Sequence, residues 1–357
     1  MASYIIRRLL LMLPTLFGIS ALVFAVMAMA PGGIGANLMS RSGDMRPEER
    51  QAMMAYYNER YGLDQPMPVQ YLRWLNNISP LGFESLPGGG RGEFGLKVPD
   101  LGTSFVKNRP VLDLIGDALP VTLLLNLLTI PLVFAGSIIM GVYTARFRDG
   151  AIDVGIGTAN LALWSIPAIW MGVLLIGFLA SEQYLKWFPT SGLSTLGSGS
   201  WTFLPERTAD GWRPGYLLDL LWHLVLPVFC LTYSGFAFLT KLTRSSVLEN
   251  LQADYARTAR AKGLSESAVL WQHVFRNSLL PLMTVAATIL PGLLIGSVIV
   301  ESIFSIDGMG RLVVEAVQMR DRETVLSITL ITGLLTLASY LVVDICYALA
   351  DPRVSYD

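Results

Sequence analysis

The sequence predicts an all-α integral membrane protein, and two observations lead to that prediction. Of the 357 residues, 53% are hydrophobic and only 15% are charged, whereas roughly a quarter of the residues in a soluble protein are charged. Much of the surface must therefore face something other than water. Several apolar windows are also long enough for a transmembrane helix, which needs about 20 such residues.

Six windows meet this requirement. In chain order they are residues 9–30, 118–145, 154–181, 220–240, 277–300 and 324–343. Backbone groups cannot stay unpaired in hydrocarbon, so each window is expected to be helical. The sequence therefore predicts six transmembrane helices, the last five of which form a core over residues 118–350.

The first window shares some features with a secretion signal, namely the basic pair Arg7 and Arg8 at its start and the triplet Ala28-Met29-Ala30. Its apolar run is longer than a typical signal core, and Pro31 stands where cleavage requires a flexible residue. We therefore expect residues 1–30 to be retained as the first transmembrane helix.

The distribution of basic residues predicts the orientation. With the N-terminus in the cytoplasm, the inside segments carry about one Lys or Arg in six residues and the outside segments about one in ten, as the positive-inside rule requires. We therefore expect a multi-pass protein of the cell inner membrane with both termini in the cytoplasm. Residues 351–357 would form a cytoplasmic tail.

Residues 31–117 lie between the first two windows and are too patterned for a linker. Residues 47–61 and 69–78 resemble amphipathic helices, and the run Pro87-Gly88-Gly89-Gly90 marks a flexible middle. The segment therefore predicts a small extracytoplasmic subdomain between the first and second transmembrane helices.

The sequence lacks the patterns of the common catalytic and metal sites. It contains no G-x-x-x-x-G-K-[ST] loop, no G-x-S-x-G elbow and no H-E-x-x-H helix. Two histidines cannot build a multi-histidine metal cluster, and the two cysteines, Cys230 and Cys346, fall in apolar stretches. A net charge of −1 gives no reason to expect nucleic acid binding. We expect a non-catalytic chain whose energy source is a partner or an ion gradient.

The segment 241–276, between the fourth and fifth windows, is too hydrophilic to enter a bilayer. Residues 246–262 are rich in helix formers and end at Gly263, which can adopt the left-handed conformation of a helix C-cap. Ser265 is a suitable N-cap for a second helix over residues 266–276. This pattern predicts a compact cytoplasmic protrusion, although a solvated loop that only satisfies the positive-inside rule would fit it equally well.

The order of residues in this segment resembles the EAA loop of ABC importer permeases. Asp254 to Gly263 reads DYARTARAKG, and Phe275 to Pro281 reads FRNSLLP. Arg257 replaces the leading glutamate of the motif, a change that is usual in the dipeptide/oligopeptide/nickel branch of the family. Further stretches with the same resemblance are YIIRRLL at 4–10, RYGLDQP at 60–66, LGTS at 101–104, ESIFS and GMG within 301–310, and DPR at 351–353.

The resemblance implies a type I ABC importer permease fold and a chain that forms half of the translocation path for peptides or similar small solutes. The implied partners are a second homologous permease, two ATPase subunits or domains, an extracytoplasmic solute-binding protein and membrane lipid. ATP and Mg²⁺ would be bound by the ATPases, with no cofactor in this chain.

The resemblance also implies a set of residues that couple the permease to its ATPase: Tyr255, Ala256, Arg257, Ala259, Arg260, Lys262 and Gly263. In this interpretation, Ala259 lies on the helix face that enters a groove of the ATPase. The 31–117 segment would contact the binding protein, because Met53, Tyr56 and Tyr57 would otherwise lack a cover.

Two other classes of protein stay open as alternatives. A stand-alone secondary transporter is disfavoured because the windows hold no paired acids and the chain shows no inverted repeats. An intramembrane enzyme is disfavoured because the windows hold no paired carboxylates and no nucleophile–base pair.

Three ionisable residues in or near the windows have a structural and a functional interpretation each. Asp344, near the end of the last window, either anchors the helix end or takes part in gating. His223 is better explained as an interfacial anchor beside Trp222. Glu301 either touches the substrate or the binding protein, or is simply solvated at the membrane surface.

Overall fold

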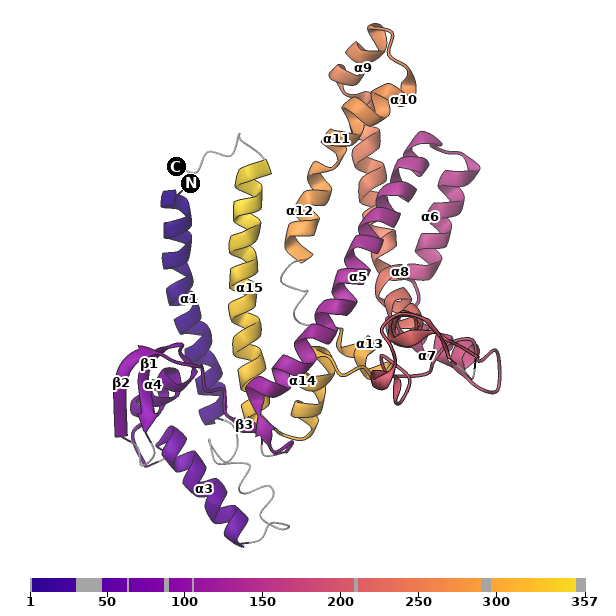
Figure 1. Ribbon diagram of the computed structural model, residues 1–357. Coiled ribbons are helices and arrows are strands. Elements are labelled where there is room, and N and C mark those ends of the chain that lie inside the picture. The colour runs from indigo at the N-terminus through magenta and orange to yellow at the C-terminus, as the bar shows by residue number, and fades with distance from the viewer. Residues whose placement is uncertain are drawn as a thin grey trace. The chain divides into compact units, whose positions relative to one another are not determined.

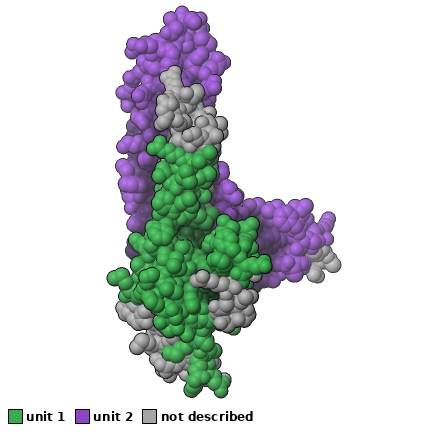
Figure 2. Space-filling view, turned by 90° about the vertical axis from the view of Figure 1, so that its left-hand side faces the viewer, with its two compact units in different colours: residues 1–117, 312–357 green, residues 118–311 purple. Residues whose placement is uncertain are grey.

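The computed structural model describes residues 2–29, 47–62, 64–86, 90–104, 106–208, 211–289 and 297–350. That part of the chain is mostly helical, with three short antiparallel hairpins (Figure 1). The chain divides into two compact units, Met1–Asp117 with Leu312–Asp357 and Ala118–Arg311, which Figure 2 shows in different colours. The predicted tail, residues 351–357, lies outside the described residues.

Four helices of the described part are long and apolar enough to cross a membrane. They are α1 Ala2–Met29, α5 Val111–Arg146, α8 Gly215–Gln252 and α15 Arg322–Ala350. They coincide with the first, second, fourth and sixth apolar windows. Both α5 and α8 continue well past their windows, so that polar ends extend beyond the apolar stretch.

The third window does not form one straight helix. It contains most of α6 Ala151–Trp164, then α7 Ala168–Leu175 and the π-helical turn η1 Ile176–Ala180, and the chain bends by 92° between Trp164 and Ala168. Pro167 causes the break, because proline lacks an N–H and disfavours a helical conformation in the residue before it. The carbonyl of Ile166, freed by the break, accepts a hydrogen bond from the Tyr233 hydroxyl at 2.6 Å.

The fifth window is described only in pieces. The structure shows α11 Phe275–Ser278, α12 Leu280–Ile289 and α13 Val298–Ile303, and residues 290–296 between them lie outside the described part. The described chain thus holds four spans, or five if the bent pair α6 and α7 counts as one.

In the first unit, α1 and α15 pack against each other, and Gly333 lies so close to Ile19 that an added Cβ would be 3.3 Å from it. The two helices predicted after α1 are present as α3 Pro47–Tyr61 and α4 Met67–Ile78, and of these α4 is clearly amphipathic. Together these helices bury a core of Val23, Phe24, Tyr61 and Trp74, with Leu326 and Leu330 of α15 beside it.

Two hairpins complete the first unit, and the sequence analysis did not predict them. Strands β1 Leu81–Leu86 and β2 Gly90–Leu96 pair antiparallel, with Leu81 opposite Leu96 and Phe83 opposite Phe94. Strands β3 Thr103–Ser104 and β4 Arg109–Pro110 form a second, very short pair.

In the second unit, α5 and α8 approach closely at small residues. A Cβ on Gly136 would be 2.7 Å from Phe236, and one on Gly141 would be 2.5 Å from Thr243. The main core includes Leu125, Met171, Leu224, Tyr233 and Phe304. The remaining elements are η2 Ser198–Ser200, β5 Glu206–Thr208 paired with β6 Gly211–Arg213, α9 Asp254–Ala261, α10 Glu266–Ala268, the π-helical turn η3 Val269–Val274, and α14 Met309–Gln318, which leads back to the first unit.

Candidate functional site

The segment predicted to couple to an ATPase forms a helical protrusion at one end of the second unit, where Figure 1 shows α9 and α10 beyond α11. The backbone of Ala253 is extended, with φ −66° and ψ 152°, and this ends α8 and starts α9. The Ala253 carbonyl accepts the first hydrogen bonds of α9, from the N–H groups of Ala256 and Arg257. The single helix predicted over 246–262 is therefore two helices joined at Ala253.

Gly263 ends α9 as the sequence predicts, and its left-handed conformation is confirmed by a φ of +84°. Its N–H donates to the carbonyl of Arg260 at 2.9 Å, and the N–H of Leu264 donates to the carbonyl of Ala259 at 3.3 Å. These two bonds define a Schellman cap. A Cβ added at Gly263 would meet no atom within 4 Å, so backbone strain alone makes this position favour glycine.

The predicted N-cap of the next helix is also confirmed. The Ser265 side chain accepts a hydrogen bond from the N–H of Ala268 at 3.3 Å. From there α10 continues through η3 into α11 without an extended residue. The protrusion is thus a helix, a turn over residues 262–265, and a second helix. The turn caps the C-terminal end of α9 and the N-terminal end of α10.

The inner face of α9 is made of alanines. Ala256 is fully buried and Ala259 nearly so, and both belong to a cluster in the second unit. The other buried members are Val142 and Ala145 of α5, Val247 of α8, and Val269, Leu270 and Val274 of η3. Ala259, predicted to lie on the helix face that enters a groove of the ATPase, is packed on the chain's own core in this structure, where its small side chain lets α9 approach closely.

The outer face of α9 and the turn that follows it carry four of the residues predicted to contact the ATPase. Tyr255 is 38% exposed, and Arg257, Lys262 and Gly263 are exposed. Arg257 lies 3.6 Å from Asp254 across one turn, a pair with both side chains in solvent. Such a pair contributes little to stability, so replacing it by contacts with another molecule would cost little free energy.

Arg260 lies between the two faces and joins three elements. Its guanidinium donates to the carbonyl of Leu251 at the end of α8, at 3.1 Å, and to both carboxylate oxygens of Glu266 in α10, at 2.8 and 3.3 Å. A planar, bidentate pair of this kind restricts geometry more than a lysine contact would. Arg260 therefore holds the protrusion in shape.

The base of the protrusion is tied down by residues that sequence reasoning missed. Arg244 of α8 donates twice to Asp153 of α6, at 2.7 and 2.6 Å. Ser246 and Ser278 exchange hydrogen bonds with each other's carbonyls at 3.1 and 3.4 Å, which joins α8 to α11. Asp153 lies one residue before the third window, and this placement was the one signal that could have indicated its pairing.

Glu301 is neither solvated nor available to a substrate. Its carboxylate is fully buried and accepts hydrogen bonds from the Thr122 hydroxyl at 3.1 Å and the N–H of Arg311 at 3.0 Å. A Cβ on Gly308 would be 2.6 Å from the carboxylate, and one on Gly310 would be 2.7 Å from the backbone of α13. The GMG stretch is therefore needed so that the backbone can wrap around Glu301.

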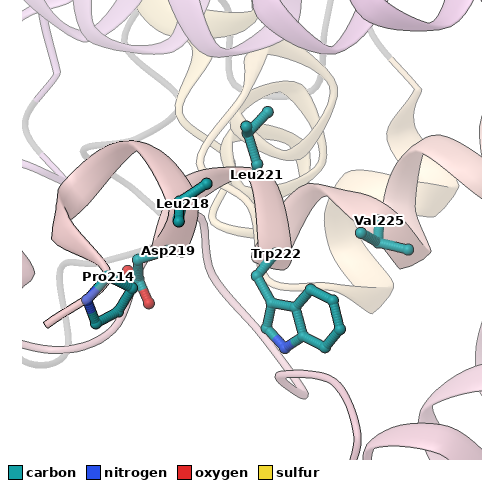
Figure 3. Close-up of a pocket in the computed structure, with 6 residues that line it drawn as sticks. All are labelled: Pro214, Leu218, Asp219, Leu221, Trp222 and Val225. Atoms are coloured by element: carbon teal, nitrogen blue, oxygen red, sulfur yellow. The ribbon is translucent and has the colours of Figure 1, made fainter. Parts of the chain in front are cut away.

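A pocket of about 410 Å³ lies at the start of α8. It is lined by Pro214, Leu218, Asp219, Leu221, Trp222 and Val225, which Figure 3 shows on successive turns of the helix. Asp219 accepts hydrogen bonds from the N–H and hydroxyl of Thr195, at 2.7 and 2.6 Å, so its carboxylate holds the preceding loop in place. His223 is buried with its Nδ1 2.8 Å from the Asp219 carbonyl, which argues against an interfacial anchor there. The exposed Trp222 is better placed for that role.

In the first unit, the RYGLDQP stretch supplies a buried polar network. Arg60 pairs with Asp100, and its Nε lies 4.0 Å from Glu323 of α15. The Tyr61 hydroxyl donates to Glu323 at 2.6 Å. Burial raises the pKa of Tyr61 well above its usual value, and the charge of Glu323 raises it further, so Tyr61 stays a donor. Gly102 has φ +91°, and a Cβ there would be 2.5 Å from Glu323.

This network and the core around Tyr61 pack the C-terminal end of α3 against the chain's own helices, whereas Met54 earlier in α3 is 47% exposed. Tyr56 is half-buried beside that core, so its cover comes from within the unit. The side chains of Met53, Tyr57 and Asp344 lie outside the described residues.

The long apolar helices indicate a polytopic membrane protein, and comparison with known proteins gives its family. Residues 137–356 match the family described as "Binding-protein-dependent transport system inner membrane component", and residues 1–126 match the description "Binding-prot-dependent transport system membrane comp, N-term". The chain belongs to this family. It is a non-catalytic, multi-pass permease subunit of an ABC importer in the inner membrane.

Named relatives cover the whole chain. The oligopeptide transport system permease protein AppB of Bacillus subtilis (strain 168) is 38% identical over 356 residues, 100% of each chain. The di/tripeptide transport system permease protein DppB of Pseudomonas aeruginosa (strain UCBPP-PA14) is 34% identical over 363 residues, 100% of this chain and 99% of that one. A solved structure titled "Crystal structure of an amino acid ABC transporter with histidines" matches with a TM-score of 0.46 at 15% identity, over 71% of this chain and 100% of that one.

Proposed function

We propose that the chain forms half of the translocation path of an ATP-driven importer for peptides or similar small solutes. The names of the full-length relatives support peptides as the solute class. A second homologous permease would supply the other half, and a solute-binding protein would deliver the solute. ATP and Mg²⁺ would be bound by two ATPase subunits or domains, with no cofactor held by this chain.

The proposal includes the type I permease fold with six transmembrane helices and both termini in the cytoplasm. The four long apolar helices and the bent pair support five of the spans. The apolar composition of residues 277–300 supports the remaining one. In this arrangement residues 31–117 are extracytoplasmic, residues 118–350 form the core, and the segment 241–276 faces the cytoplasm.

The outer face of α9 is the proposed contact with the ATPase, through Tyr255, Arg257, Lys262 and the turn at Gly263. The observation that carries this assignment is the difference between the two faces of α9. The alanine face packs against α5 and α8, whereas the opposite face is exposed and basic. A push or pull on the outer face would therefore be transmitted to two membrane helices and could switch the path between its inward-facing and outward-facing states.

Replacing Gly263 tests this proposal. A β-branched residue at φ +84° is strained by about 1–2 kcal/mol, too little to unfold the protein but enough to tilt the capped turn. We expect Gly263→Val to insert normally, to co-purify less ATPase and to uncouple ATP hydrolysis from peptide uptake. Gly263→Asn is the matched control, because asparagine tolerates the left-handed region. Full ATPase attachment and full uptake in Gly263→Val would refute the assignment.

A further inference from the structure

The outward face of the β1–β2 hairpin is apolar and has no cover within the described part of the chain. Leu81 and Phe83 point to the same side as their cross-strand partners Leu96 and Phe94, because alternate residues of a strand share a face. All four are exposed, and Leu96 is 83% exposed. In a water-exposed hairpin this face would normally be polar.

The opposite face of the hairpin rests on α4. Gly82 is buried there, and a Cβ at this position would be 2.5 Å from the side chain of Asn76. The exposed residues at the start and middle of α4 are also apolar and include Met67, Val69 and Leu72. Helix α4 and the described residues of the hairpin therefore form one module, and its described exposed residues are apolar except for Glu93.

The contacts of α4 with α1 give the depth of this module in the membrane. The Tyr71 hydroxyl is 2.8 Å from the Ser20 hydroxyl, and the Tyr71 ring lies 5.8 Å from Phe17 and 5.3 Å from Phe24. The apolar stretch of α1 that spans the membrane is Leu9–Val26. At 1.5 Å per residue, Ser20 lies about 9 Å from the end of that stretch and about 14 Å from Met29, where α1 ends.

Helix α4 therefore packs on the apolar stretch of α1, near its C-terminal end. Helices that lie in the membrane surface bury their apolar face roughly 5–10 Å into the boundary between headgroups and acyl chains. Helix α4 contacts the C-terminal half of α1, as Figure 1 shows, and strand β1 contacts α4. The exposed residues Leu22, Val26 and Met29 of α1 are also apolar, and by helical periodicity they lie on the side of α1 away from α4.

The hairpin also solves the problem of its open edge. An unpaired strand edge is costly near hydrocarbon. At Phe83, the side-chain amide of Asn76 replaces a neighbouring strand: it accepts from the Phe83 N–H at 2.8 Å and donates to the Phe83 carbonyl at 2.9 Å. Lys97 also donates to that carbonyl, at 2.8 Å.

We propose that the module of α4 and the β1–β2 hairpin is seated in the lipid leaflet at the C-terminal end of α1, with Leu81, Phe83, Phe94 and Leu96 in contact with phospholipid. The apolar character of the face and the packing of α4 on the apolar stretch of α1 favour lipid over a soluble protein. The inference rests on α1 crossing the membrane and not on the solute or the ATPase contact.

Depth-dependent fluorescence quenching tests the proposal. The full-length chain, with both native cysteines replaced by alanine, receives one labelled cysteine and is reconstituted into phosphatidylethanolamine–phosphatidylglycerol vesicles. We expect a bimane label in Leu96→Cys to be quenched severalfold more by lipids spin-labelled near the headgroup than by lipids labelled near the chain end, and to resist iodide. Leu127→Cys, on the exposed side of α5, should be quenched by the deep label, and the fully exposed Leu196→Cys by iodide.

Two results would overturn the proposal. Quenching of the Leu96 label by iodide and by neither lipid would place the hairpin in water. Protection from all three quenchers, either in the chain alone or after addition of the second permease or the binding protein, would assign the face to a protein partner. Peptide uptake by the complete importer is measured separately, so loss of uptake would bear on the proposed function and leave the lipid contact to the quenching data.

Discussion

Single residues in this protein show two different reasons for glycine. Gly263 is needed for its backbone angle, because a side chain there would find open space. Gly308 is needed for space, because its Cα lies against the buried carboxylate of Glu301. Sequence reasoning found the first, since a glycine after a helix has a known local use. It could not find the second, since the partner of Gly308 is decided by tertiary packing.

We therefore expect Gly308→Ala to lower the stability of the purified protein. The added methyl group overlaps the Glu301 carboxylate and Thr122, and overpacking of this kind costs about 1–3 kcal/mol. Gly157→Ala is the control, because this helical glycine has no atom within 4 Å of the new Cβ and should be neutral or slightly stabilising. Thermal unfolding followed by size-exclusion chromatography in detergent measures both. Equal melting temperatures would mean that the structure accommodates the added methyl group at position 308 without strain.

At the scale of elements, hydropathy predicted the long helices α1, α5, α8 and α15 and failed at the third window. A window average cannot register one proline, yet Pro167 turns the chain by 92°. Helices α3 and α4 were predicted because the pattern of apolar residues at 47–61 and 69–78 is visible in the sequence. The hairpins were not, because the contacts that place the β1–β2 hairpin on α4 are decided by tertiary packing.

The break at Pro167 depends on Tyr233, which is buried and donates to the Ile166 carbonyl. Tyr233→Phe keeps the ring but leaves that carbonyl without this donor, at an expected cost of about 1–3 kcal/mol. We predict a lower melting temperature for Tyr233→Phe. Tyr184→Phe, at an exposed ring, should not change it. An unchanged melting temperature in Tyr233→Phe would show that the bend needs no bond from this hydroxyl.

The segment between α1 and α5 is attached to α15 through Arg60. Glu323 is buried beside this guanidinium, and removal of one partner from a buried charged pair costs about 3–5 kcal/mol. We expect Arg60→Ala to loosen residues 47–110, so that limited proteolysis cleaves them sooner than in the parent protein. Arg109→Ala removes an exposed pair with Asp117 and should leave the cleavage rate unchanged. Equal rates for the two variants would show that the network does not hold the segment.

For the whole molecule, family resemblance predicted more than physical pattern did. Composition and window length gave a helical membrane protein. The order of short motifs along the chain gave the permease family, which the full-length relatives confirm. The direction of the alanine face of α9 could not be predicted from the motif, because both faces of a short helix rich in Ala and Arg are compatible with docking.

Topology is the property of the whole molecule that the bent pair α6 and α7 makes testable. If the pair crosses the membrane, Leu196 lies outside while Asp149 and Lys262 lie inside. If the pair enters and leaves on the same side, Leu196 and Asp149 share the inside and Lys262 lies outside, because α8 crosses in either case. We predict that an impermeant maleimide labels Leu196→Cys in intact cells, and labels Asp149→Cys and Lys262→Cys only after permeabilisation. All three positions are exposed, whereas Ser198 in the same loop is buried and would report nothing. Labelling of Lys262→Cys alone in intact cells would remove one span from the proposal, and labelling of both Asp149→Cys and Lys262→Cys would reverse its orientation.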